Sequence, residues 1–183
     1  IEKYEYNPEK AKELLASSGV TGVTLKFGYQ ANNVPQQRQA AIIQQNLKEI
    51  GINVELAAGE PNAIYQQMEN ADTDYDMFLN GYIMGIDPDK YNALFISTSP
   101  SNFMHSNNPE VDRLFDLGRV ETDTAKRQEI YTEIQKIIQD DAYFFPLLEN
   151  KRIVVINSSI KGVEDAKLVP IYTFEDMSKL YFE

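Results

Sequence analysis

Two aspartates, Asp87 and Asp89, flank Pro88 and are the paired carboxylates in this sequence that could do acid–base chemistry. Closely spaced carboxyl groups can share a proton and so divide the roles of acid and base. Side chains at positions i and i+2 around a proline usually point apart, however, and no partner histidine or third acid is nearby in the sequence. The spacing therefore favours a role in a turn and helix cap, with ligand contact as the second interpretation and catalysis as the weakest.

The chain contains a single histidine, His105, and no cysteine. The lack of cysteine excludes thiol catalysis, disulfides and zinc–thiolate sites, and one histidine leaves little room for a Ser-His-Asp triad. His105 lies in a polar loop over residues 97–108, which also holds Asn102 and Phe103. Loops of this length inside a compact domain are often functional. We therefore count Asn102, Phe103 and His105 as candidate ligand contacts, with a plain surface role as the alternative for His105.

The acidic stretch over residues 72–76 imitates the start of an EF-hand calcium loop. That loop requires Gly at its sixth position and Glu at its twelfth, where this chain has Met77 and Ile83. A solvated acidic turn is the favoured interpretation. The sequence also lacks a Gly-rich phosphate loop, a G-x-S-x-G motif and an H-E-x-x-H motif. We predict no catalytic residue, no metal site and no cofactor, and hence no enzyme.

The element that would position these residues is an apolar run from Met77 to Met84, which has the length of a buried strand. The run breaks at Gly85 and continues into the Asp-Pro-Asp corner. A strand that ends at a glycine and a proline-fixed turn brings backbone to the edge of a sheet. In open α/β sheets, ligands bind at the edge beyond the carboxyl ends of the strands. This edge is the predicted binding region.

The other elements follow a helix–strand rhythm that is typical of a largely parallel sheet. Asn-Pro-Glu at residues 7–9 and again at 108–110 indicates two helix starts. Predicted strands cover residues 23–29, 52–56 and 152–156, residues 143–148 form a strand start or edge, and predicted helices begin at about residues 8, 35, 61, 109 and 123. The fold class is α/β, and we expect residues 1–183 to form a single domain.

The composition fits a soluble core, with 43% hydrophobic residues and no apolar run long enough to span a membrane. The formal net charge of −11 argues against nucleic acid as a partner, because phosphates would be repelled over most of the surface. The plainer meaning of this charge is solubility.

Taken in order, several segments resemble the oligopeptide/dipeptide-binding family, the extracellular solute-binding components of bacterial ABC importers. The similar stretches cover nearly the whole chain. They are Tyr6-Asn7-Pro8-Glu9-Lys10-Ala11, Leu47-Lys48-Glu49-Ile50-Gly51-Ile52, Tyr75-Asp76-Met77 into Gly81-Tyr82, Asp87-Pro88-Asp89, Leu94-Phe95, Asn108-Pro109-Glu110-Val111-Asp112-Arg113-Leu114, residues 127–138, Asp141-Ala142-Tyr143, Pro146-Leu147 and Lys161-Gly162-Val163.

This resemblance implies a periplasmic-binding-protein-like lobe of type II, with a mixed β-sheet flanked by helices. The chain would be the C-terminal, ligand-binding lobe of a larger two-lobed protein whose N-terminal lobe lies upstream. Family members bind their ligand between the lobes, where a strand lends backbone groups to an extended peptide. Carried over by position, those groups belong to Asn80, Gly81, Tyr82, Ile83 and Met84.

The pattern departs from the family at Gly85. Well-known peptide binders of the family carry an aspartate three residues after the aromatic, where it pairs with the α-amine of the peptide. Three residues after Tyr82 stands Gly85, and the next carboxylate is Asp87. Either Asp87 takes the place of the amine anchor or the ligand has no free amine there, so Gly85 and Asp87 are both candidate ligand contacts.

The implied function is capture of oligopeptides for ABC-dependent import. The alternatives are another solute, such as a metal chelate, a sugar or an opine, and a peptide receptor that signals without transport. The implied partners are the ligand and the membrane permease subunits, with no nucleic acid. We expect a monomer on the extracellular face of the bacterial cytoplasmic membrane, either lipid-anchored or periplasmic.

Overall fold

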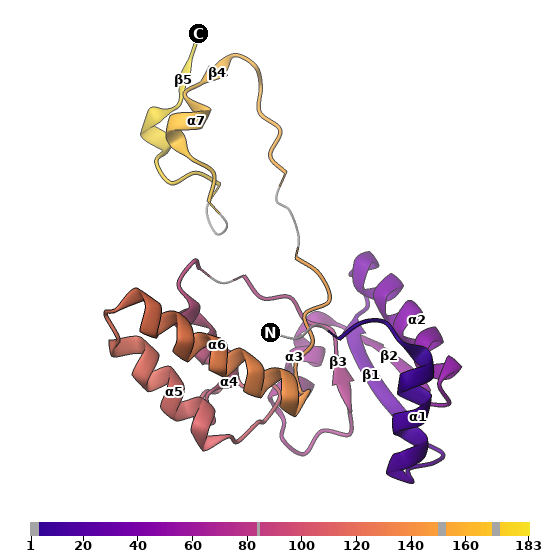
Figure 1. Ribbon diagram of the computed structural model, residues 1–183. Helices are drawn as coiled ribbons and strands as arrows, with labels where there is room; N and C mark the ends of the chain where they lie inside the picture. The colour runs from indigo at the N-terminus through magenta and orange to yellow at the C-terminus, as the bar shows by residue number, and fades with distance from the viewer. Residues whose placement is uncertain (1–3, 84, 150–152, 170–172) are drawn as a thin grey trace. The chain divides into compact units, whose positions relative to one another are not determined.

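The computed structural model describes residues 4–83, 85–149, 153–169 and 173–183 (Figure 1). The chain divides into two compact units, one made of residues 1–81 and 100–105 and the other of residues 82–99 and 106–183. The chain thus passes from one unit to the other between Gly81 and Tyr82, directly within the predicted binding segment. That both units belong to a single domain, the C-terminal lobe of a larger protein, stays a prediction.

The first unit contains a three-stranded parallel sheet, in the order β2-β1-β3, within the described residues. Its elements are α1 (Pro8–Ser18), β1 (Thr24–Gln30), α2 (Val34–Glu49), β2 (Asn53–Gly59), α3 (Pro61–Glu69) and β3 (Met77–Phe78). Strands β1 and β2 pair along their full length, from Thr24 with Asn53 to Gln30 with Gly59. The predicted alternation of helices with parallel strands is confirmed.

The helices of this unit begin where the sequence signals placed them. The side chains of Asn7 and Asn33 accept hydrogen bonds from the backbone N–H groups of Lys10 and Gln36, at 2.9 and 3.2 Å. A proline lies in the first turn of α1 and α2, where a missing N–H costs no helical bond. Local capping chemistry therefore decides where these helices start.

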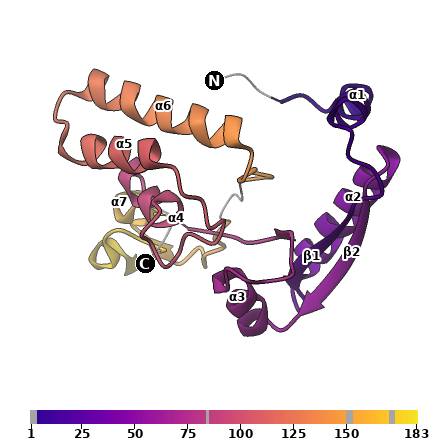
Figure 2. The same ribbon diagram turned by 90° about the horizontal axis from the view of Figure 1, so that it is seen from below.

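The core of the first unit lies between α2 and the sheet, and α2 runs along β1 and β2 in both views (Figures 1 and 2). Its buried members are Phe27, Ala40, Val54 and Leu79, with Tyr29, Ile43, Leu47, Leu56 and Met77 packed against them. Each strand contributes alternate residues, as a half-buried strand must. Two apolar side chains of these helices, Ile42 in α2 and Leu14 in α1, are exposed and lie outside this core.

Strand β3 is much shorter than the predicted run from Met77 to Met84. It pairs with β1 only at Met77 and Phe78, and the N–H of Leu79 makes the last bond, to the carbonyl of Gly28 at 2.9 Å. The next residue, Asn80, turns its side chain back onto the N–H of Gly81 at 2.8 Å. This local bond diverts the backbone from the ladder, which ends the strand.

The second unit is built on two adjacent helices, α5 (Pro109–Val120) and α6 (Thr124–Asp141), preceded by η1 (Pro88–Tyr91) and α4 (Asn92–Phe95). Asn108 caps α5 by accepting from the backbone of Glu110, as expected. The buried residues of the pair are Val111, Leu114, Phe115 and Gly118 in α5 and Tyr131, Ile134 and Ile138 in α6. Further elements are β4 (Ile160–Lys161), α7 (Val163–Ala166), η2 (Met177–Lys179) and β5 (Tyr181–Phe182), with β4 and β5 antiparallel.

Two predicted strands are wrong for the residues that the structure describes. Residues 143–148 and 153–156 adopt no strand, and the side chains of Ile153 and Val155 are 85% and 93% exposed. β-branched residues favour an extended backbone, but a strand also needs a neighbouring strand that completes its hydrogen bonds. Within the described residues, neither segment has such a neighbour.

Gly28 permits the close approach of two stacked aromatic rings to β1. The rings of Tyr75 and Phe78 are parallel within 9°, with centroids 5.1 Å apart. A Cβ atom on Gly28 would lie 2.6 Å from the ring of Phe78 and 2.8 Å from that of Tyr75. Glycine is therefore required here for space, because these contacts are shorter than van der Waals packing allows.

We predict that Gly28→Ala lowers the free energy of unfolding by about 1–3 kcal/mol, because the ring pair and β3 must shift away from β1. Urea unfolding of the purified protein measures the change. Gly85→Ala is the matched control, since the nearest atom to its added Cβ is 3.8 Å away. The control should change the free energy by no more than about 0.5 kcal/mol. Equal effects of the two substitutions would contradict the steric argument.

Candidate functional site

The carboxyl ends of the three parallel strands lie at one edge of the sheet of the first unit. Gln30 pairs with Gly59 at the ends of β1 and β2, and Phe78 ends β3 beside Gly28. Helix α3 starts directly after β2 and thus also begins at this edge. The predicted residues Asn80 and Gly81 follow β3 after one residue, Leu79. The parallel topology therefore brings the predicted binding region to the edge at which α/β sheets bind ligands.

Asn80 is held at this edge by α3. Its side-chain oxygen accepts a hydrogen bond from the hydroxyl of Tyr65 at 3.1 Å and one from the N–H of Gly81 at 2.8 Å. The N–H of Gly81 is therefore engaged within the protein. Asn80 and Gly81 are both exposed.

The polar loop returns to the same helix. The ring of Phe103 lies 6.2 Å from the ring of Tyr65, and Asn102 is only 5% exposed. His105 bonds through Nε2 to the carbonyl oxygen of Met68 at 3.0 Å. Because a carbonyl oxygen only accepts, this bond requires a hydrogen on Nε2. The structure thus brings together Asn80, Phe103 and His105 around α3.

Tyr65 is the residue that sequence reasoning missed. It contacts both Asn80 and Phe103, while Met68, one turn later on α3, holds His105. The sequence contained one usable signal: Tyr65 and Met68 are three residues apart and so lie on one helical face, next to a strand end. A tyrosine on such a face offers an apolar ring and a polar hydroxyl together.

The backbone of residues 80–83 is the exposed part of the predicted binding segment. The side chains of Tyr82 and Ile83 are 48% and 70% exposed. In the described parts of the chain, the backbone of Tyr82 and Ile83 makes no hydrogen bond to another residue. Met84, also predicted as a ligand contact, lies outside the described residues. The described segment after β3 therefore presents main-chain donors and acceptors to the surroundings.

In the second unit, Asp87 caps the turn that follows this segment. Its Oδ1 atom accepts from the N–H of Asp89 at 2.8 Å and from Nη2 of Arg127 at 2.7 Å. The guanidinium of Arg127, followed by the N–H of Asp89, holds the pKa of Asp87 below its usual value. The favoured interpretation of the sequence, a role for Asp87 in a turn and helix cap, is confirmed. The role of Asp87 as a ligand contact stays a prediction.

Asp89 is bound by residues of both α5 and α6. Nε of Arg119 on α5 lies 3.6 Å from Oδ2 of Asp89, and the hydroxyl of Tyr131 on α6 donates to Oδ1 at 3.3 Å. The pKa of Tyr131 is raised, first by burial and next by the charge of Asp89. A shared proton between Asp87 and Asp89 is not the arrangement seen here, because each carboxylate has its own arginine.

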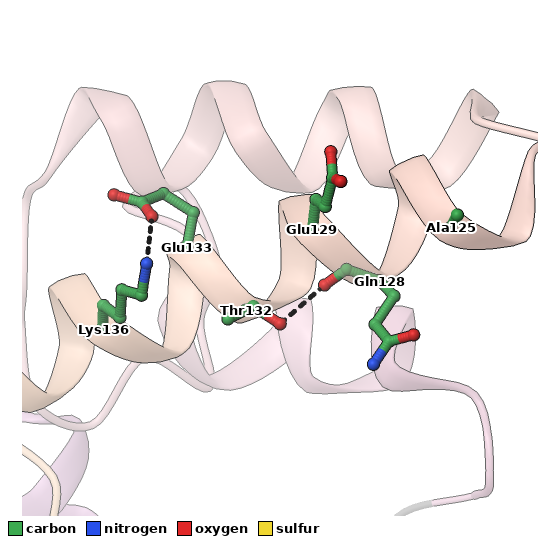
Figure 3. A pocket seen from close by; sticks show the side chains of 6 residues that line it. All are labelled: Ala125, Gln128, Glu129, Thr132, Glu133 and Lys136. Carbon is green, nitrogen blue, oxygen red and sulfur yellow. Dashed lines mark hydrogen bonds and ion pairs between the residues drawn. The ribbon is translucent and has the colours of Figure 1, made fainter. Parts of the chain in front are cut away.

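Among the described residues, a surface pocket lies along one face of α6 and involves none of the predicted contacts (Figure 3). It is lined by Ala125, Gln128, Glu129, Thr132, Glu133 and Lys136. Lys136 pairs with Glu133 at 3.2 Å, and the hydroxyl of Thr132 donates to the carbonyl of Gln128 at 2.8 Å. Its polar groups thus bond to their own helix, which is the behaviour of a solvated face. No group of three acidic or histidine side chains in the described residues could hold a metal ion.

The lowered pKa of Asp87 predicts how its ion pair depends on pH. At about pH 7, we expect the wild type to be more stable than Asp87→Asn, since asparagine still accepts from Asp89 but cannot pair with Arg127. Because the folded pKa is below the ordinary value of 3.8, this difference is complete above 3.8 and is lost as the pH falls through the folded pKa. Urea unfolding of both proteins from about pH 7 down to about pH 2 measures it.

Asp72→Asn, a change at an exposed aspartate of the acidic loop, is the control and should leave the stability unchanged at neutral pH. A stability difference between the wild type and Asp87→Asn that persists unchanged at the lowest pH would contradict the ion-pair explanation.

No helix in the described ranges is both long and apolar enough to cross a membrane. Comparison with known proteins extends the picture. Peptide transport periplasmic protein SapA of Haemophilus influenzae is 29% identical over 186 residues, which cover 98% of this chain and 32% of SapA. The chain thus spans about a third of the length of the curated relatives that it matches.

Two solved structures are similar over the whole chain. The ABC transporter substrate binding protein CtaP of Listeria monocytogenes has a TM-score of 0.92 and 38% identity, over 100% of this chain and 38% of CtaP. The binding protein DppA of Helicobacter pylori, in complex with the peptide STSA, has a TM-score of 0.74 and 26% identity, over 100% of this chain and 36% of DppA. The predicted periplasmic-binding-protein-like α/β fold of type II is confirmed.

The model of the family described as bacterial extracellular solute-binding proteins, family 5 (Middle), matches residues 1–104. That range includes the whole parallel sheet, the exposed segment after β3, the turn at Asp87 and the polar loop up to Phe103. Both the sequence match and the structural similarity point to one family: this chain belongs to the bacterial extracellular solute-binding proteins of family 5.

Proposed function

We propose that the protein containing this chain captures oligopeptides outside the cytoplasmic membrane and presents them to an ABC importer. The observation that carries this proposal is the similarity along the whole chain to CtaP, an ABC transporter substrate binding protein, and to peptide-bound DppA. SapA, named for peptide transport, supports the same substrate class. Because the chain spans about a third of these relatives, the proposal concerns the protein of which it forms part.

The exposed segment over residues 80–83 would bind the backbone of an extended peptide. A peptide that adds to such a segment gains main-chain hydrogen bonds, which depend little on its sequence. The main-chain groups of Tyr82 and Ile83, which make no hydrogen bond to another of the described residues, suit this role, whereas the N–H of Gly81 is engaged by Asn80. Met84 and Gly85 continue the proposed segment. Asn102, Phe103 and His105 stay predicted contacts for ligand side chains.

The protein would act by binding alone, without chemical change to the ligand. The proposed partners are the membrane permease subunits of the importer, and the proposed location is the outer face of the cytoplasmic membrane, as a lipid-anchored or periplasmic monomer. Capture followed by closure of two lobes would bury the ligand and form the surface that docks on the transporter.

A second candidate function is capture of a solute other than a peptide. The observation that favours it is the turn itself, where glycine stands at residue 85 and the carboxylate of Asp87 pairs with Arg127. A site without a free carboxylate at this point has no special preference for the ammonium group of a peptide.

Ligand identity can be tested without choosing a ligand in advance. We expect mass spectrometry of the full-length protein, purified under native conditions and then denatured, to release a series of short peptides. A parallel sample that is unfolded in urea and washed before refolding should release none. A single non-peptide compound, released in proportion to protein, would favour the second candidate.

The backbone role predicts a large effect of Ile83→Pro in the full-length protein. Proline removes the N–H and fixes φ, so affinity for a co-purified peptide should fall at least about tenfold, or about 1.4 kcal/mol. Titration calorimetry with the synthetic peptide measures the loss. Ile83→Ala is the matched control, since it shortens the exposed side chain and keeps the backbone. Wild-type affinity in Ile83→Pro would exclude the backbone role.

A further inference from the structure

The turn after the exposed segment contains the only two acids between residues 77 and 109, Asp87 and Asp89. Any ammonium group recognised by a carboxylate at this turn must therefore use one of them. Both carboxylates are already bound by side chains of α5 and α6 within the second unit. The question that follows is whether either can still bind a positively charged ligand group.

Arg127 is fixed in place by more than its ion pair with Asp87. Its Nε atom donates to the carbonyl of Gly118, in the last turn of α5, at 2.9 Å. Its guanidinium carbon lies 4.9 Å from the ring centre of Tyr131, which is 7% exposed. Movement of Arg127 away from Asp87 would break three contacts together: those with the Asp87 carboxylate, the Gly118 carbonyl and the ring of Tyr131. The guanidinium therefore stays beside Asp87.

Space for this arrangement is provided by Gly118. A Cβ atom at Gly118 would lie 2.8–2.9 Å from the ring of Tyr131. The close approach allows the Tyr131 hydroxyl to reach Asp89 at 3.3 Å, while Arg119 pairs with the other oxygen of Asp89. Asp87 and Asp89 are thus bound by side chains of α5 and α6, and the close contact between these two helices depends on Gly118.

Positively charged side chains lie beside the acids of the turn, although the chain as a whole is acidic. Asp87, Asp89 and Asp116 face Lys90, Arg119 and Arg127. The whole chain has a formal net charge of −11. An ammonium that approached Asp87 would meet the guanidinium bound to the same carboxylate, and the repulsion would offset the attraction. The lowered pKa of Asp87 agrees with a carboxylate whose charge is already compensated.

We propose that Arg127 and Arg119 withdraw Asp87 and Asp89 from ligand recognition, so that the protein captures its ligand without anchoring an ammonium group at this turn. Arg127 is then a positioning residue that determines specificity through Asp87. The inference rests on the proposed function only where the ligand is a peptide. It implies that blocking the amino terminus of a peptide costs no affinity at this turn.

A first experiment tests the turn without any peptide. Glycinamide, which carries an α-ammonium and no carboxylate, is titrated into the full-length protein while NMR follows the side-chain carboxyl carbon of Asp87. We expect no saturable shift in the wild type and a saturable shift in Arg127→Gln. In the double variant Arg127→Gln/Asp87→Asn, we expect the signals of the neighbouring backbone amides to show no saturable shift. Saturable binding at Asp87 in the wild type would overturn the proposal, even if Arg127→Gln failed to fold.

Arg113→Gln is the matched control, because it also removes one arginine of α5 or α6. Arg113 pairs with Glu110 at 2.6 Å and has no contact with the turn among the described residues. This variant should behave as the wild type does. A saturable shift in Arg113→Gln equal to that in Arg127→Gln would show that loss of any positive charge suffices, which contradicts the proposed role of Arg127.

A second experiment uses tetra-alanine and N-acetylated tetra-alanine in titration calorimetry. We expect the ratio of their dissociation constants to be the same, within about threefold, for the wild type and for Asp87→Asn. A tenfold or greater preference for the free amine that Asp87→Asn removes would overturn the proposal. The same preference unchanged in Asp87→Asn would place the amine elsewhere and support it. If neither peptide binds, the peptide function fails, while the glycinamide titration still decides the role of the turn.

Discussion

The point at which the chain leaves the sheet is the constraint on which the rest of this structure depends. Asp76 fixes it, because its N–H donates to the carbonyl of Lys26 at 2.9 Å while its carboxylate accepts from the N–H of Lys26 at 2.7 Å. These paired bonds set the register of β3 against the central strand. With the register fixed, Leu79 enters the core and Asn80 is the first residue beyond it. That placement determines where Asn80 and Gly81, the start of the proposed binding segment, lie at the edge of the sheet.

The acids around the exposed segment serve the fold of the protein. Asp76 completes the ladder before the segment, and Asp87 and Asp89 secure the turn after it. Replacing one of these acids by a side chain that accepts no hydrogen bond would leave its donors unmatched. Each end of the segment is thus secured within its own unit.

Much of the fold could be predicted from local sequence signals. Asn-Pro pairs located the starts of α1 and α5, and the alternation in β1 and β2 identified their buried faces. These features depend on residues that are near one another in the chain. The length of β3 could not be predicted in this way, since it depends on pairing with β1, about fifty residues earlier. The strand predicted for the β-branched residues 153–156 was wrong for the same reason, because a strand depends on a pairing partner elsewhere in the chain.

In the candidate site, too, features set by local sequence could be predicted, and contacts between distant residues could not. The exposed segment and the polar loop were found from their sequence, because a glycine-ended apolar run and a long Asn/Ser-rich loop are local features. Tyr65 was missed, since its contacts with Asn80 and Phe103 join three separate elements. The partner of Asp87 was missed too, because Arg127 is forty residues later and no local pattern connects them.

The bond from His105 to α3 limits which side chains could stand at this point of the polar loop. The ring donates from Nε2 to the carbonyl of Met68 at 3.0 Å, and the backbone N–H of His105 bonds to the carbonyl of Asn102 at 3.0 Å. The backbone bond does not involve the side chain, so the attachment of the loop to α3 at this residue depends on the ring. Because a carbonyl oxygen only accepts, a side chain without a donor could not replace the imidazole, although the backbone bond within the loop would remain.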